Sequence, residues 1–188
     1  GGTWVLLDEA AGTLWTETLD TPIATEARPG TLLQRSALQG TQVVMSDDSG
    51  ITRVGLDGSG YARLTEASGT PAKPITLDGV TYAAWMTETQ GTLWTSEYGT
   101  ADLDFGGRTL SDDRQPEFVS NGTRAVLNEQ RSGWVWNLPD GELLPSSQEW
   151  RIDERTPQTT ERMRPEQVTD PKPPIAEDDT FGVRVGRS

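Results

Sequence analysis

The stretch GTLWTETL at residues 12–19 returns almost unchanged as GTLWTSEY at residues 91–98. Each copy follows a short apolar run and a polar turn, and each begins with a glycine. Four lines of the sequence share this order: GTWVLLDEAAGTLW from residue 2, GTQVVMSDDSGITR from residue 40, GVTYAAWMTETQGTLW from residue 79 and GTRAVLNEQRSGWVW from residue 122. Each line thus contains a β-prone run, a turn and a second β-prone run. This pattern occurs four times and predicts four β-hairpins.

The second glycine of each line is predicted to be a structural turn glycine, where the hairpin needs a positive φ or a bulge. These residues are Gly12, Gly50, Gly91 and Gly133, and they follow one another at intervals of roughly 40 residues. A period of about 40 residues with several short β runs is typical of one four-stranded blade of a β-propeller. Stacking such units lets each sheet cover the faces of its neighbours, which explains why the sequence repeats.

Further strand candidates lie between the hairpins, at residues 61–65, 75–77, 102–105 and 117–120. No apolar stripe of helical period is long enough to predict a helix. The predicted fold class is therefore all-β: β-propeller-like repeats forming about four short antiparallel sheets, as part of a larger propeller, followed by an extended Pro-rich linker.

Three regions are expected along the chain. Residues 1–156 form the repeat region, in which the first of about four blades is incomplete. Residues 157–177, PQTTERMRPEQVTDPKPPIAE, are rich in proline and charge with little to bury, which indicates a linker. Residues 178–188, DDTFGVRVGRS, are interpreted as the first strand of a following Ig-like or cadherin-like domain, so the sequence is expected to be a piece of a longer protein.

The composition excludes several kinds of chemistry. The chain has no cysteine and no histidine, so thiolate catalysis, Cys/His zinc sites, Ser-His-Asp triads and disulfides are absent from it. Its formal net charge of −13 repels phosphate backbones and anionic headgroups, which disfavours nucleic acid and membrane surfaces as partners. No apolar run is long enough to span a membrane, so any anchor is expected outside this segment.

Two acidic patterns have a structural and a functional interpretation. Residues 46–52, SDDSGIT, fit the Asp-box pattern S-x-D-x-G-x-T of sialidase-like propellers, in which an aspartate ties down a hairpin turn and takes no part in catalysis. Adjacent aspartates could supply oxygen ligands to Ca²⁺. The sequence holds three such pairs, but none has the alternation of an EF-hand loop, and solvated turns are the simpler interpretation: Asp47–Asp48, Asp112–Asp113 and Asp178–Asp179.

The chain contains seven tryptophans: Trp4, Trp15, Trp85, Trp94, Trp134, Trp136 and Trp150. Exposed aromatic faces would suit stacking against sugar rings, whereas packing between sheets is the simpler reason for the six that lie in the hairpins. A carboxylate pair for glycoside hydrolysis is not selected by any pattern. We therefore expect no catalytic residue, no cofactor site and no metal site.

The runs PITLDGVTYAAWMTETQGTLW, PEFVSNGTRAVLNEQRSGWVWNLPDGELLPSSQEW and PPIAEDDTFGVRVGRS, from about residue 74 to the end, resemble a family. It comprises the actinobacterial cell-surface proteins in which an N-terminal β-propeller-like repeat region precedes tandem Ig-like or cadherin-like and fibronectin type III domains. The resemblance implies display at the cell surface, with an anchor elsewhere in the protein, and it transfers no catalytic residue.

These observations predict a non-enzymatic extracellular interaction or scaffold segment that presents a propeller platform ahead of Ig-like modules. Its partner is expected to be a protein or a cell-envelope component, and a second chain or the C-terminal tail could pair with an exposed edge strand. The alternatives are a glycan-binding lectin, whose tryptophans would face solvent, and a glycan-active propeller enzyme of the sialidase or lyase kind, which would gather carboxylates and arginines at a central channel.

Overall fold

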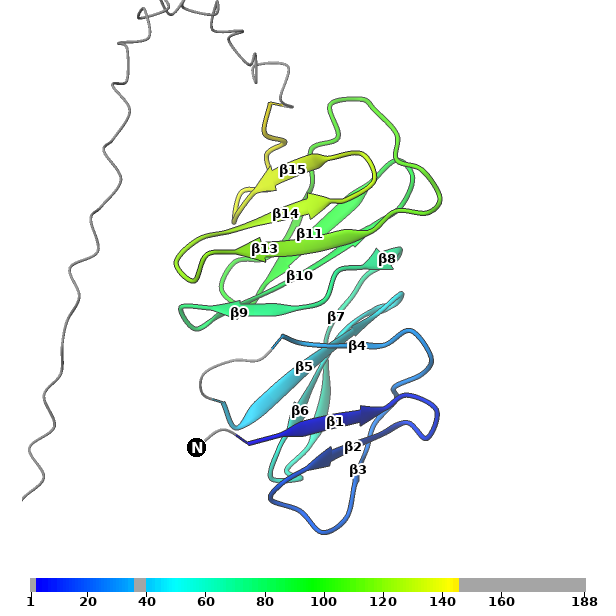
Figure 1. Cartoon of the computed structure of the whole chain (residues 1–188), viewed down its shortest axis with the longest axis vertical. Helices are drawn as coiled ribbons and strands as arrows, with labels where there is room; N and C mark the ends of the chain where they lie inside the picture. The colour runs from blue at the N-terminus through cyan, green and yellow to red at the C-terminus, as the bar shows by residue number, and fades with distance from the viewer. Residues whose placement is uncertain (1–2, 36–39, 146–188) are drawn as a thin grey trace, which may run out of the picture. The chain divides into compact units, whose positions relative to one another are not determined.

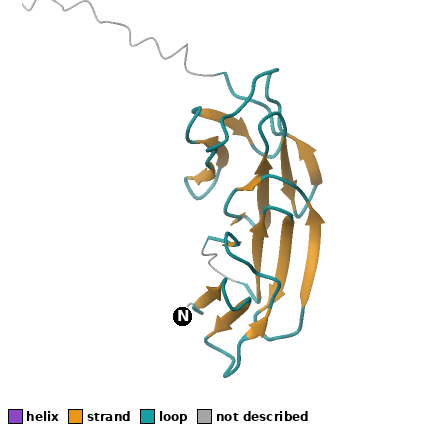
Figure 2. Ribbon diagram, turned by 90° about the vertical axis from the view of Figure 1, so that its right-hand side faces the viewer, coloured by secondary structure: helices purple, strands orange, loops and turns teal. Residues whose placement is uncertain are grey.

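The computed structural model describes residues 3–35 and 40–145, and these residues form strands, turns and loops without any helix (Figures 1 and 2). The strands make four antiparallel sheets, which we name A to D in chain order. The all-β class and the expectation of several antiparallel sheets are thus confirmed. The predicted linker at 157–177 and the predicted strand at 178–188 lie outside the described residues, as does the end of the repeat region after residue 145.

Each sheet is built from strands that are neighbours in the sequence. Sheet A contains β1 (Val5–Asp8), β2 (Thr13–Thr16) and β3 (Ile23–Ala24); sheet B contains β4 (Leu32–Leu33), β5 (Gln42–Asp47), β6 (Gly50–Gly55) and β7 (Tyr61–Glu66). Sheet C contains β8 (Thr70–Pro71), β9 (Ile75–Leu77), β10 (Val80–Met86), β11 (Gly91–Thr95) and β12 (Gly99–Asp102); sheet D contains β13 (Pro116–Ser120), β14 (Ala125–Glu129) and β15 (Trp134–Asn137).

The four predicted hairpins are confirmed, and each belongs to a different sheet. They are the pairs β1–β2, β5–β6, β10–β11 and β14–β15. Their strands end at the cross-strand pairs Asp8–Thr13, Asp47–Gly50, Met86–Gly91 and Glu129–Trp134. A strand lies on the N-terminal side of the hairpin in sheets B, C and D, and sheet A, which has three strands, begins with its hairpin.

Three of the four strand candidates between the hairpins are also found, as β7, β9 and β13. The prediction at residues 102–105 is wrong, because β12 ends at Asp102. Leu103 and Phe105 beyond it are buried in the core, which accounts for the apolar pattern that suggested a strand.

Neighbouring sheets share hydrophobic cores. Sheets A and B meet at a cluster that includes Leu14, Val43 and Val54. Sheets B and C meet at Val44, Ile51, Ala83 and Trp85. Sheets C and D enclose the largest cluster, formed by Ala72, Ile75, Ala84, Met86, Leu93, Leu103, Phe105, Leu110, Phe118, Leu127 and Trp136. Alternate residues of a strand point to opposite faces, so the hairpins of sheets B and C each contribute to two cores.

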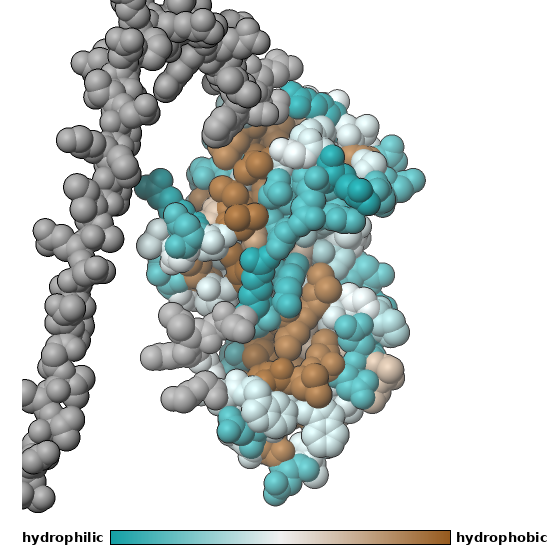
Figure 3. Space-filling model, in the orientation of Figure 1, coloured by the Kyte–Doolittle hydropathy of each residue, from teal (hydrophilic) through white to brown (hydrophobic). Residues whose placement is uncertain are grey.

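Two indole N–H groups tie neighbouring sheets together. Trp85 of sheet C donates to the carbonyl oxygen of Asp47 in sheet B, at 2.7 Å. Trp136 of sheet D donates to the carbonyl oxygen of Asp104, at 2.6 Å. Both side chains are fully buried, so these bonds satisfy the one polar atom of each ring. In the space-filling view, further hydrophobic residues gather at the surface over sheet D and around β4 and β5 (Figure 3).

Candidate functional site

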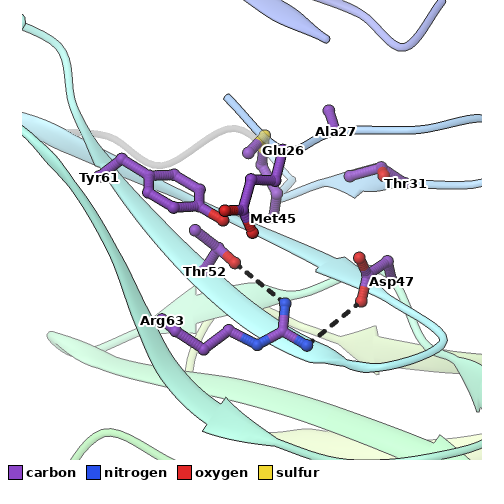
Figure 4. A pocket seen from close by; sticks show the side chains of 8 residues that line it. All are labelled: Glu26, Ala27, Thr31, Met45, Asp47, Thr52, Tyr61 and Arg63. Carbon is purple, nitrogen blue, oxygen red and sulfur yellow. Dashed lines mark hydrogen bonds and ion pairs between the residues drawn. The ribbon is translucent and has the colours of Figure 1, made fainter. Parts of the chain in front are cut away.

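A small cavity lies in sheet B beneath the segment that leads to β4, and its lining includes the charged residues Glu26, Asp47 and Arg63 (Figure 4). Its volume of about 10 Å³ is close to the minimum for one water molecule. Arg63 of β7 crosses it and donates to the hydroxyls of Thr52, at 3.3 Å, and Ser49, at 2.6 Å. The same guanidinium lies 3.6 Å from the carboxylate of Asp47.

The carboxylate of Asp47 is the electrostatic centre of this cavity. Its side chain is 14% exposed, and it accepts hydrogen bonds from the backbone N–H of Ser49, at 2.9 Å, and from the Ser49 hydroxyl, at 2.7 Å. Burial raises the pKa of Asp47, but the bonds from Ser49 and the charges of Arg63 and Arg28 outweigh burial and leave the pKa below its ordinary value of 3.8. Asp47 is therefore ionised at neutral pH. It stabilises the turn and has no proton to donate.

Tyr61 points its hydroxyl into the same cavity, beside Glu26 (Figure 4). This hydroxyl is buried and has no hydrogen-bond partner of ordinary geometry among the described residues. Burial first, and then the neighbouring Glu26 carboxylate, raise the pKa of Tyr61 above its ordinary value. The phenol is thus neutral at physiological pH, and a single water in the cavity would satisfy it.

The Asp-box pattern identifies the correct turn and the wrong carboxylate. The pattern's aspartate is Asp48, but its side chain is 71% exposed and forms a surface ion pair with Arg28. Asp47, one residue earlier, ties the turn through Ser49. The difference arises because Asp47 ends β5 opposite Gly50, which leaves only Asp48 and Ser49 in the loop.

Acidic residues at the same place hold two other hairpin loops. Asp8 ends β1 and accepts hydrogen bonds from the N–H groups of Ala10 and Ala11, at 3.1 and 2.9 Å. Glu129 ends β14, is fully buried, and accepts hydrogen bonds from three backbone N–H groups, those of Gln115, Arg131 and Ser132. Asp8 and Glu129 were not predicted from the sequence. The sequence feature that could have identified them is an acidic residue near the end of the apolar run, which occurs in three of the four repeated lines.

The acidic pairs are held by arginines. Arg28 faces the Asp47–Asp48 pair, and Arg114 and Arg131 face the Asp112–Asp113 pair. Within residues 3–35 and 40–145 no three acidic side chains gather as a metal ion would require. The third pair, Asp178–Asp179, lies outside the described residues.

The predicted turn glycines separate into two kinds. Gly12, Gly50 and Gly133 have positive φ angles of 63°, 141° and 72°, as the hairpin argument expects. At Gly91 the structure shows neither a positive φ nor a bulge, because this residue begins β11 in extended conformation and pairs regularly with Met86. A Cβ atom on Gly91 would lie 2.7 Å from Cδ1 of Leu103 and 3.0 Å from Cε1 of Phe105, so the site requires glycine for space.

The tryptophans differ in exposure as the packing of their sheets dictates. Trp85 and Trp136 are fully buried, and Trp94 and Trp134 pack partly against the cores. Trp4 is 54% exposed and Trp15 is 38% exposed. Trp150 lies outside the described residues. Packing between sheets thus explains four of the seven, and the sugar-stacking interpretation applies only to partly or fully exposed rings.

One open groove combines an aromatic ring with several polar groups. It has a volume of about 440 Å³ and lies between sheets B and C. Trp94 lines it, together with the side chains of Arg53, Gln42, Thr81 and Ser96. An aromatic face with surrounding donors and acceptors is the usual composition of a site for a polar ring-shaped ligand.

Comparison with known proteins found no matching family model, no matching curated protein and no matching solved structure. The part of the chain that the structure describes also contains no helix long and apolar enough to cross a membrane.

Proposed function

We propose that the chain is a non-enzymatic interaction or scaffold segment of a protein displayed at the cell surface, and that its sheets are successive blades of a β-propeller-like platform. Binding would use the loops and faces of the sheets, with a protein or a cell-envelope component as partner. The surface location rests on the resemblance of residues 74–188 to the actinobacterial surface proteins described above.

The stacking of the sheets is the observation that carries this proposal. Every pair of sheets that is consecutive in the chain shares a hydrophobic core, and each sheet is made of sequence-adjacent antiparallel strands. This is the construction of propellers and related repeat proteins, which provide rigid strands and variable loops for binding. β1 pairs with β2 alone among the described strands, so its free edge is a further place where an extended segment of a partner could add.

A scaffold also fits the way in which the acids of the hairpins are used. Asp8, Asp47 and Glu129 hold loop N–H groups, and Arg63 is bound to the turn of β5–β6. Groups fixed in this manner stabilise the fold, whereas catalysis needs groups that are free to touch a substrate.

The surface location is tested on intact cells of the source organism. An antiserum against residues 1–145 should detect the protein on unbroken cells, and external protease should remove that signal while a cytoplasmic marker survives. Protection of the protein from protease until the cells are lysed would refute surface display.

The groove at Trp94 supports a second candidate, glycan binding. The test is a calorimetric titration of the full chain with cellohexaose and with oligogalacturonate, which differ in charge. If the groove binds sugar, Trp94→Ala should abolish binding and Trp4→Ala, at an exposed tryptophan outside the groove, should retain it. Tryptophan quenching alone does not separate the candidates, because Trp4 and Trp15 are exposed in either case.

A further inference from the structure

The outer face of sheet A is apolar, and no other part of residues 3–35 and 40–145 covers it. Leu6 of β1 and Trp15 of β2 are a directly opposed cross-strand pair, and their side chains are 60% and 38% exposed. Trp4, two residues before Leu6, is 54% exposed. The opposite face of the same hairpin, with Leu7 and Leu14, packs into the core shared with sheet B. Sheet A therefore buries one face and leaves aromatic and aliphatic side chains on the other.

The corresponding face of sheet C shows what such a surface contacts. The sequence GTLWT occurs in both hairpins, and Trp94 of sheet C corresponds to Trp15 of sheet A. Trp94 is paired with Ala83 as Trp15 is paired with Leu6. In sheet C this face packs against Val44 and Ile51 of sheet B, which are aliphatic side chains of a neighbouring sheet.

The outer face of sheet D carries three valines beside the polar residues Glu117, Asn128 and Asn137. Val119 of β13 is directly opposite Val126 of β14, and Val119 is 48% exposed. Val135 of β15 lies on the same face by strand alternation and is partly exposed. The inner face, with Phe118, Leu127 and Trp136, is fully buried against sheet C, which leaves the valines without a neighbouring sheet among the described residues. Hydrophobic residues gather at the surface over these strands (Figure 3).

We propose that these two faces bind each other between two copies of this chain, with the valines of sheet D in one copy packed on Trp15 and Leu6 of sheet A in the other. The contact repeats the one between sheets B and C, where aliphatic residues of one sheet meet the tryptophan face of the next. The two complementary faces belong to the first and the last described sheet, so the contact is head-to-tail. The inference rests on the sheet faces and does not depend on surface display.

A head-to-tail contact closes when the second copy returns to the first, and otherwise continues into a chain of molecules. Two copies would bring together eight sheets of the kind described here, within the range of about four to eight blades seen in propellers. The net charge of −13 repels a second copy at low ionic strength, whereas an apolar contact does not weaken with salt. Self-association should therefore strengthen as the salt concentration rises.

The test is sedimentation velocity of the full chain over a range of protein and salt concentrations. The unmodified chain should form dimers or longer assemblies. Trp15→Glu on sheet A and Val126→Glu on sheet D should each weaken self-association by about 30-fold or more, the effect of losing a central interface residue. Tyr98→Glu is the matched control, because Tyr98 is 67% exposed in the turn after β11, away from both faces.

Mixing the two variants distinguishes the head-to-tail contact from others. Trp15→Glu keeps an intact sheet D face and Val126→Glu keeps an intact sheet A face, so an equimolar mixture should associate more strongly than either variant alone. Circular dichroism and melting temperatures establish that both variants are folded. A chain that is monomeric at all concentrations would overturn the proposal, and so would association that survives Val126→Glu, since that result points to contact between two A faces.

Discussion

Gly91→Ala tests whether this glycine is required for space. The added methyl group would lie 2.7 Å from Leu103 Cδ1, 3.0 Å from Phe105 Cε1 and 3.2 Å from Leu103 Cβ, within the core between sheets C and D. Overpacking of this kind costs about 1–3 kcal/mol, and the lower entropy of the unfolded chain offsets about 0.4–1 kcal/mol of it. We expect a net loss of about 1–2 kcal/mol in the free energy of unfolding.

The assay is urea unfolding followed by tryptophan fluorescence, and Leu103→Ala identifies the cause. This truncation alone should cost about 2–5 kcal/mol because it leaves a cavity. It also makes room for the methyl group, so the double variant should be more stable than the sum of the two losses predicts, by about 1–2 kcal/mol. Gly133→Ala is the control, since Gly133 has a φ of 72° and open space around it.

The strain at Gly133 does not involve Leu103, so that pair of substitutions should be additive. If Gly91→Ala were neutral, or if its cost added fully to that of Leu103→Ala, the steric explanation of Gly91 would be refuted.

Three other predictions follow from the buried polar groups. Glu129→Gln should lower the free energy of unfolding at pH 7 by about 1–3 kcal/mol; the pKa of Glu129 is held below its ordinary 4.5, so the stabilisation is present above about that pH and is lost as the pH falls through the folded-state pKa. An acid titration of stability should be flatter for this variant, and equal slopes would contradict the argument. Asp47→Ala should lower the free energy of unfolding by about 1–3 kcal/mol, measured by chemical denaturation, whereas Asp48→Ala, at an exposed ion pair, should lower it by less than about 0.5 kcal/mol. Equal losses would show that Asp48 stabilises the turn as much as Asp47 does. Trp136→Phe leaves the carbonyl of Asp104 without its indole donor and should lower stability by about 1–3 kcal/mol, and an unchanged denaturation midpoint would show that water replaces that bond.

The sequence predicts the hairpins well because their signals are local. An apolar run, a polar turn and a glycine specify where the chain reverses, and all four reversals are at the predicted places. The all-β class follows from the same pattern. The strand prediction at residues 102–105 is wrong because Leu103 and Phe105 are apolar to fill the core between sheets C and D, and a loop can supply such residues as well as a strand.

The site was harder to predict, because its members are joined by pairing across strands. Arg63 reaches Asp47 and Ser49 only after β7 has paired with β6, and no local pattern marks that arginine. The same limit applies to Gly91. The sequence predicts that this position requires a glycine, but it does not predict the steric cause of that requirement. The reason lies in Leu103 and Phe105, which come after the next strand.

The two copies of GTLWT show why a local sequence does not determine its own surroundings. Trp15 and Trp94 have the same neighbours in the chain and the same place in their hairpins, but Trp94 packs against sheet B and Trp15 is left exposed. What differs is whether another sheet stands on that side. Since a stacked sheet buries both faces only through its neighbours, the exposed copy shows where the next sheet has to be supplied. Trp15 is thus the most informative residue of the chain, because its counterpart Trp94 packs against a neighbouring sheet and Trp15 is exposed.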